Sequence, residues 1–99
     1  MAHLVVTVRA APDAADIFER LTDTAGTNVA MRYRREIDTL HDRLSLFPRS
    51  GMRRPSLGRD VRIGVVWPYV AIHEHRSDTV TVLRVLDGRR NITRRLVRE

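Results

Sequence analysis

Arginine is the residue type that dominates the reactive side chains of this chain. All 18 of its basic residues are arginine, lysine is absent, and the net charge is +6. Planar guanidinium groups bind carboxylates and phosphates through paired hydrogen bonds more readily than ammonium groups do. We therefore expect an acidic partner, either nucleic acid or an acidic protein surface, although basic residues can also serve only to solubilise a surface.

The first candidate site lies in the last quarter of the chain. The residue pattern of Thr79–Leu86 predicts a strand that runs into a glycine turn. Arg84 falls inside this strand, on the face expected for Val82 and Leu86, where a charge is costly without a partner. The expected target-binding residues here are Arg84, Arg89 and Arg90. The alternative is that Arg84 packs its stem at a sheet edge and leaves its head in water.

A second basic cluster occupies residues 49–62, which hold five arginines against one acid, Asp60. A basic loop beside a strand suits an extended acidic partner, but a solvated loop would have the same composition. Trp67 and Tyr69 follow, and aromatic residues exposed at a turn can anchor an interface. In the alternative, Tyr69 belongs to the core and Trp67 covers the end of the sheet. The expected target contacts are Arg62, Trp67 and Tyr69.

Histidine supplies the remaining chemistry. His73 and His75 should share one strand face, and His41 falls in a predicted helix. Two histidines can bind zinc, but a site needs three or four supported ligands, and the chain has no cysteine. We expect neither a metal nor another cofactor. A general-base role for His73 is the one enzymatic role left open.

The length of 99 residues fits one domain, residues 1–99. No apolar run approaches the roughly 20 residues of a membrane span. There is also no basic region followed by an apolar stretch at the N-terminus, so no signal peptide is expected. With no cysteine, a reducing, cytoplasmic location is the natural expectation.

Two helices should follow a first strand at His3–Arg9. The first should open at Ala11-Pro12-Asp13 and end at Gly26, with Thr27 or Asn28 capping the second, which Pro48 stops. Their apolar stripes are Ala14, Ile17, Phe18 and Leu21 in the first helix, and Val29, Tyr33, Ile37, Leu40, Leu44 and Phe47 in the second. So short a connection requires an antiparallel helical hairpin.

The second half of the chain predicts a sheet. Residues 48–60 are rich in Pro, Gly and Ser and are expected to be an irregular loop. Alternating patterns then predict strands at 61–65, 69–75 and 79–86, joined by short turns as an antiparallel meander. Residues 92–96 could add a short strand or a turn of helix. The expected fold is α+β in the order β-α-α-β-β-β, with the hairpin covering one sheet face.

The chain resembles the ParE/RelE superfamily of bacterial toxins, and most closely its ParE branch. Four features in order carry the resemblance over nearly the whole chain: Leu44-Ser-Leu-Phe-Pro48, Gly51 to Gly58 leading to Arg62, Pro68-Tyr69-Val70, and Val82 to Ile92. The resemblance implies the β-α-α-β-β-β fold and a neutralising, ParD-like antitoxin. It also implies a target, which is DNA gyrase for the ParE branch and mRNA in the ribosome for the RelE branch.

The residues favour binding over cutting. RelE-like ribonucleases typically carry arginine where this chain has Val70, and a Tyr or His near the C-terminus, which residues 88–99 lack. Arg53, Arg54 and Arg59 could replace their basic row, but arginine is a poor proton acceptor. Together with the resemblance to the ParE branch, which implies gyrase as the target, this favours a gyrase inhibitor with no catalytic residues. The alternative, a ribosome-dependent endoribonuclease, would use Arg84, Arg90 and His73.

An antitoxin is expected to use excess apolar surface of the helices together with basic residues of the loop. The candidate antitoxin-binding residues are Ile17, Phe18, Leu21, Tyr33, Ile37, Arg53 and Arg54. The acidic face of the first helix, which includes Asp13, is a further candidate for contact with a basic antitoxin segment.

Overall fold

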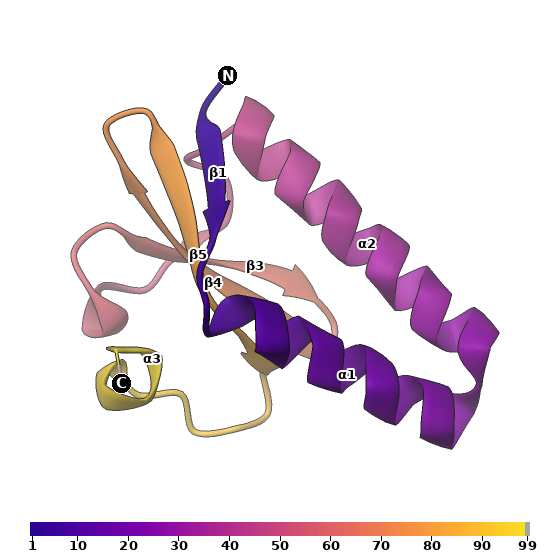
Figure 1. The fold of residues 1–99 in the computed structure, drawn as a ribbon. Helices are drawn as coiled ribbons and strands as arrows, with labels where there is room; N and C mark the ends of the chain where they lie inside the picture. The colour runs from indigo at the N-terminus through magenta and orange to yellow at the C-terminus, as the bar shows by residue number, and fades with distance from the viewer. Residues whose placement is uncertain (99) are drawn as a thin grey trace.

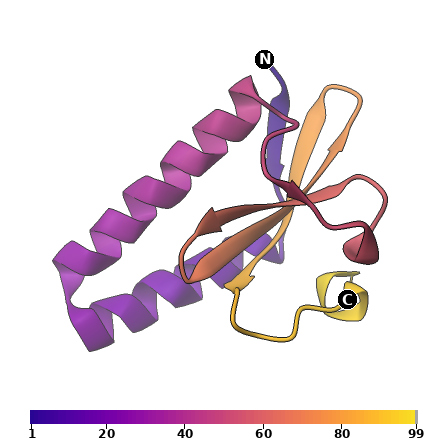
Figure 2. The ribbon, with the colours of Figure 1, turned by 180° about the vertical axis from the view of Figure 1, so that it is seen from behind.

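A computed structural model describes residues 1–98, and it confirms the α+β class and the helical hairpin (Figure 1). Its elements are β1 (His3–Val6), α1 (Ala10–Ala25), α2 (Thr27–Leu46), β2 (Met52–Arg53), the 3-10 helix η1 (Pro55–Leu57), β3 (Val61–Val66), β4 (Tyr69–Arg76), β5 (Thr79–Asp87) and α3 (Arg94–Arg98). The hairpin of α1 and α2 lies on one side of the sheet, and α3 lies on the other (Figures 1 and 2).

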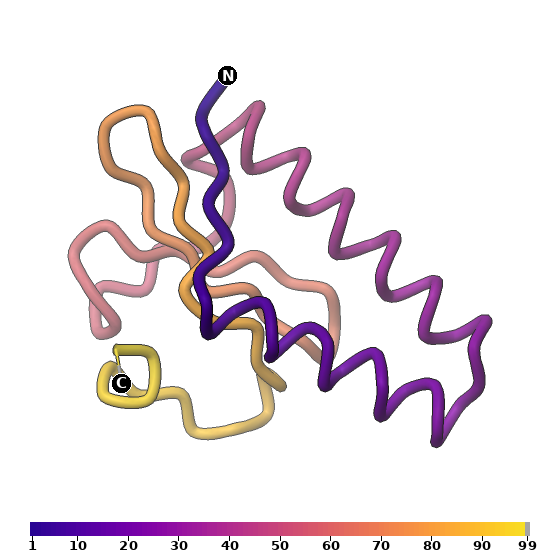
Figure 3. Tube along the Cα trace, viewed as in Figure 1, coloured from indigo at the N-terminus to yellow at the C-terminus, as the bar shows by residue number. Residues whose placement is uncertain are grey.

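The five strands form one sheet in the order β1-β5-β4-β3-β2. The predicted antiparallel meander of β3, β4 and β5 is confirmed. β1 pairs with β5 in parallel, with Leu4 opposite Val80. The Cα trace follows these two strands side by side, although they come from opposite ends of the sequence (Figure 3).

The prediction that residues 48–60 lack regular structure was wrong. Met52 pairs with Ile63 in β3, and η1 follows at Pro55–Leu57. Leu57 is only 1% exposed, so this segment is anchored in the core by one apolar side chain. The sequence did not reveal this anchor, because a single buried leucine in a segment rich in Pro and Gly produces no repeating pattern of apolar residues.

Three element boundaries differ from the prediction: the end of β1, the start of α2 and the end of α2. The first strand stops at Val6, because Thr7 turns the chain and its Oγ1 accepts a hydrogen bond from the Ala10 N–H. Gly26 ends α1 as predicted and also precedes α2 directly, so neither Thr27 nor Asn28 caps the second helix. Phe47 leaves helical geometry and is 64% exposed, so it does not continue the apolar stripe.

Apolar clusters fill both faces of the sheet. Ile17, Leu40, Leu44, Val80, Val82 and Val85 are among the buried residues beneath the hairpin. Leu57, Val61, Val70, Ile72, Leu86 and Val97 form the cluster on the α3 side. The C-terminal tail is therefore the turn of helix that was one of its two predicted forms, and Val97 fixes it to the sheet.

A bulge in β5 reverses the faces of its side chains. Ile72 lies opposite Arg84 and His73 lies opposite Val82, which leaves Leu83 without a partner. An extra residue of this kind shifts the alternation of side chains by one position. Val82 consequently packs beneath the hairpin, whereas Leu86 packs on the α3 side. The expectation that Arg84 shares a face with both residues was wrong for Val82.

Candidate functional site

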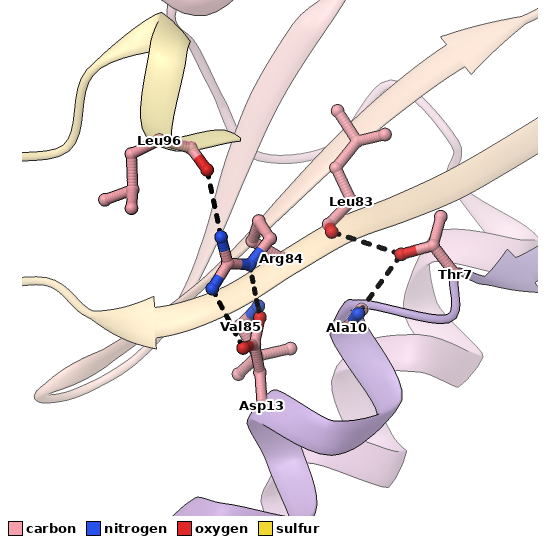
Figure 4. A network of polar contacts seen from close by, with 7 residues as sticks. All are labelled: Thr7, Ala10, Asp13, Leu83, Arg84, Val85 and Leu96. Carbon is pink, nitrogen blue, oxygen red and sulfur yellow. Dashed lines mark hydrogen bonds and ion pairs between the residues drawn. The ribbon is translucent and has the colours of Figure 1, made fainter. Parts of the chain in front are cut away.

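Arg84 is held inside the molecule by Asp13 at the start of α1 (Figure 4). Its Nε donates to Asp13 Oδ2 at 2.6 Å and its Nη2 donates to Oδ1 at 3.0 Å, a paired arrangement typical of strong ion pairs. Its Nη1 donates to the Leu96 carbonyl of α3 at 2.9 Å. The residue is 8% exposed, and the hydrogen bonds with Asp13 raise its pKa.

Asp13 also provides a hydrogen-bond acceptor for the backbone of β5 beyond the last residue that pairs with β1. Its Oδ2 accepts a hydrogen bond from the Val85 N–H at 3.1 Å, and the Thr7 hydroxyl donates to the Leu83 carbonyl at 3.1 Å (Figure 4). Arg84 and Asp13 thus join α1, β5 and α3. Both side chains are thus satisfied within the chain, which favours a structural role for Arg84 and Asp13 over contact with a target or an antitoxin.

The two arginines that follow β5, Arg89 and Arg90, differ in whether a carboxylate pairs with them. Arg89 donates from Nη2 to Asp87 Oδ2 at 2.6 Å, and this bond lowers the pKa of Asp87 to about 2 and raises that of Arg89. Arg90 is exposed, and its side chain makes no hydrogen bond or ion pair with residues 1–98. Of the three arginines expected at this end of the sheet, Arg84 is buried, whereas Arg89 and Arg90 are both exposed.

The basic cluster at residues 49–62 contributes most of a cavity of about 260 Å³ at the N-terminal end of β3. We call this cavity the arginine pocket. It is lined by Arg49, Arg53, Arg59, Asp60, Val61, Arg62 and His75. Arg62 donates from Nη1 to the Gly51 carbonyl at 3.1 Å. The pairing of β2 with β3 brings Arg53 and Arg62 together in this pocket, whereas Arg54 does not line it.

A larger groove of about 540 Å³ runs between α2 and β3, and we call it the α2–β3 groove. Its lining is Arg32, Arg35, Glu36, Thr39, Leu40, Arg43, Val65, Val66 and Trp67. Trp67 is 67% exposed and Val65 is 57% exposed. Within the described chain, β2 pairs with β3 only at Arg62 and Ile63, so the outer edge of β3 beside this groove has no neighbouring strand.

The arginines of the α2–β3 groove were missed by the sequence reasoning, although a signal was present. Arg32, Arg35 and Arg43 recur at helical spacing beside Leu40, which packs against the sheet. None of the three was among the predicted site residues. Their significance depends on Trp67, which the turn between β3 and β4 places at the same groove.

Several predicted contact residues belong to the core instead. Ile17 and Ile37 are 2% and 3% exposed, so neither can form an antitoxin-binding surface in this structure. Tyr69 packs edge-on against Tyr33, with ring centroids 5.6 Å apart, in agreement with the alternative that makes Tyr69 a core residue. Phe18 and Leu21 are partly buried against the same core.

His73 is inaccessible to any substrate. It is 0% exposed, and neither ring nitrogen has a hydrogen-bond partner among residues 1–98. Burial, with Arg62 and His75 nearby, lowers its pKa to about 4. A general base must reach the proton that it removes, so this position does not support the enzymatic alternative. Within residues 1–98, no group of three or more His, Cys, Asp or Glu side chains is arranged to hold a metal ion.

The chain is a small basic protein with a helical hairpin on one face of a five-stranded sheet. The family described as the ParE toxin of type II toxin–antitoxin systems, parDE, matches residues 4–92. Toxin ParE3 of Caulobacter vibrioides is 30% identical over 96 residues, which cover 97% of this chain and 96% of that protein. The chain therefore belongs to the ParE toxin family.

A solved structure agrees with this assignment. The chromosomal ParDE toxin–antitoxin system from P. aeruginosa contains a chain that matches with a TM-score of 0.71 and 25% identity. The match covers 86% of this chain and 94% of that one. Family membership makes this protein a toxin of a type II toxin–antitoxin system and implies an antitoxin partner. No helix within residues 1–98 combines the length and apolar character needed to cross a membrane.

Proposed function

We propose that this toxin inhibits DNA gyrase by binding it in the cytoplasm, without catalysis, and that a cognate ParD-type antitoxin neutralises it. The observation that carries the proposal is the match to the ParE toxin family over residues 4–92. The burial of His73 supports inhibition by binding, because the one candidate general base is 0% exposed.

The α2–β3 groove is the proposed contact with the target. It combines an exposed tryptophan with three arginines, and tryptophan and arginine are the residue types most often found at the centres of interfaces. The open edge of β3 adds unpaired backbone groups that a partner segment can bond. Arg62, Arg89 and Arg90 lie outside the lining of this groove and remain proposed as additional target contacts.

The test is a supercoiling assay with purified gyrase, relaxed plasmid and the purified chain. We expect loss of supercoiling, which preincubation with the antitoxin encoded beside the toxin restores. Full supercoiling activity in excess toxin would overturn the gyrase target. Cleavage of mRNA on translating ribosomes, abolished by substitution of the exposed Arg90, would instead establish the ribonuclease alternative.

Trp67→Ala tests the groove itself. Truncation of a tryptophan at the centre of an interface typically costs about 2 kcal/mol, so the inhibitory concentration should rise about thirtyfold. Phe47→Ala is a matched control, because Phe47 is 64% exposed and does not line the groove. Equal inhibition by the two variants would remove the groove from the proposal.

A further inference from the structure

We propose that the arginine pocket is a phosphate-binding site for the backbone of a nucleic acid. This inference goes beyond the proposed function, because it concerns a second ligand and is tested without gyrase. The α2–β3 groove would hold a protein, whereas the arginine pocket would hold the phosphodiester chain.

The charges of the pocket lack partners within the molecule. The guanidinium groups of Arg49, Arg53 and Arg59 form no hydrogen bond or ion pair with residues 1–98. Arg62 bonds only a backbone carbonyl, which leaves its charge uncompensated. The one carboxylate in the lining, Asp60, lies 3.5 Å from Nε of Arg76, outside the lining.

The strand register forces two of these charges together. Arg53 lies directly opposite Arg62 in the pairing of β2 with β3. Like charges in directly opposed positions destabilise a sheet, so a role in stability does not explain this pair. An anion placed between the two guanidinium groups converts the repulsion into attraction on both sides. Arg62 in turn lies opposite His73, whose lowered pKa reflects the same positive field after the larger effect of burial.

The chemistry of the lining favours phosphate over an acidic peptide. Val61 is the one apolar residue of the lining, and it is 1% exposed. Peptide partners are normally anchored by apolar or aromatic contacts, which the α2–β3 groove offers and the arginine pocket does not. A phosphodiester needs no apolar anchor, since its free oxygens accept the forked hydrogen bonds of arginine.

The test measures fluorescence anisotropy of a labelled DNA duplex, and of a labelled single-stranded RNA, titrated with the full chain at several salt concentrations. The test variant is Arg53→Gln/Arg59→Gln. The control variant, Arg20→Gln/Arg94→Gln, removes the same charge at two exposed arginines outside the pocket. Labelled polyglutamate provides the acidic-peptide arm.

We expect the test variant to bind nucleic acid about tenfold to a hundredfold more weakly, as loss of two charge-assisted contacts implies. The slope of log affinity against log salt should fall by about one for each arginine removed. The control should retain most of the affinity, and whichever of DNA and RNA binds more tightly identifies the source of the phosphate. Equal losses in the two variants, tighter binding of polyglutamate, or no binding at low salt would each overturn the proposal.

The outcome is independent of the gyrase assay. A chain that inhibits gyrase but binds neither nucleic acid would refute only the phosphate site. A chain that binds nucleic acid through the pocket but leaves supercoiling intact would refute only the proposed target.

Discussion

Arg84 of β5 and the arginines of the segment 49–62 differ in the charge of the side chain that each one faces. Arg84 meets both oxygens of Asp13 in a largely buried position. Arg53 meets Arg62, a second positive charge. The two regions have the same residue type and lie on one sheet, separated by β4, yet one guanidinium group is committed to the fold and the others are available to a ligand.

The difference shows that positive charge by itself does not locate a binding surface. A buried arginine must be paired, because removing its partner leaves an uncompensated charge inside the protein. An exposed arginine is solvated and costs little without a partner. The arginines that face solvent without a carboxylate are therefore the ones to test for function.

Arg84→Met should produce the largest loss of stability. It leaves the carboxylate of Asp13 partly buried without its cation and breaks the hydrogen bond to Leu96 of α3. Breaking a buried ion pair typically costs about 3–5 kcal/mol, which urea unfolding followed by far-UV circular dichroism would measure.

Arg94→Gln is the control for this measurement. Arg94 is exposed and without a side-chain partner among residues 1–98, so its replacement should change the unfolding free energy by less than about 0.5 kcal/mol. A loss for Arg84→Met no larger than that of the control would contradict the structural assignment of Arg84.

His73 should make the protein less stable as the pH falls from 6.5 to about 4. In this window the unfolded chain binds a proton that the folded chain excludes, because the pKa of His73 is lowered on folding. The loss is at most about 3 kcal/mol, from the linkage between proton binding and folding. Unfolding free energies measured across this window should lose most of that slope in His73→Leu.

Arg62→Gln sharpens this prediction. Removing the neighbouring cation should raise the pKa of His73 toward its ordinary value, as an NMR titration of the imidazole would show. An unchanged pKa would mean that the charge of Arg62 has little electrostatic effect on His73 in β4.

Gly51→Ala should disturb the segment that carries the unpaired arginines. Gly51 has a φ of +93°, and a Cβ there would collide with the carbonyl oxygen of Ile63. Gly26 shares that φ but has open space around it, so Gly26→Ala is the matched control for backbone strain. We expect losses of about 1–3 kcal/mol from strain in the control, and a larger loss at Gly51, in thermal unfolding. Equal losses would show that the backbone around Gly51 shifts to relieve the collision with Ile63 at little energetic cost.

Arg53→Gln should have the smallest effect on stability, and its sign is informative. Relief of the repulsion with Arg62 should leave the protein unchanged or more stable by roughly 0.2–1 kcal/mol. Arg59→Gln, in the same pocket but outside the strand pairing, should leave the unfolding free energy unchanged. A clear destabilisation by Arg53→Gln would indicate that this arginine has a structural role after all.

Much of the fold followed from local patterns. The period of the α2 stripe, the glycine at position 26 and the alternation of the last three strands placed the main elements, because each depends on near neighbours in the chain. The bulge at Leu83 was not predictable in this way. The sequence does carry a break here, because the adjacent apolar residues Val82 and Leu83 interrupt the alternation, but only the pairing with β4 shows that the break is a bulge.

The candidate site was predicted in part. The basic segment 49–62 contributes most of the arginine pocket, whereas Trp67 is exposed at the separate α2–β3 groove. Of the helix residues expected to bind an antitoxin, Ile17 and Ile37 are core, and Phe18, Leu21 and Tyr33 are half-buried. An apolar stripe indicates which side of a helix is sheltered, but it does not distinguish a surface covered by the protein's own sheet from one left for a partner.

The sequence by itself determined the purely arginine-based positive charge, the order of the two long helices and the four longer strands, and the family. The tertiary structure decided which of those charges are available. Asp13 and Arg84 are separated by 71 positions in the chain and lie 2.6 Å apart at their nearest atoms. A contact of that kind depends on how α1 docks against β5, and no local pattern of residues encodes the docking.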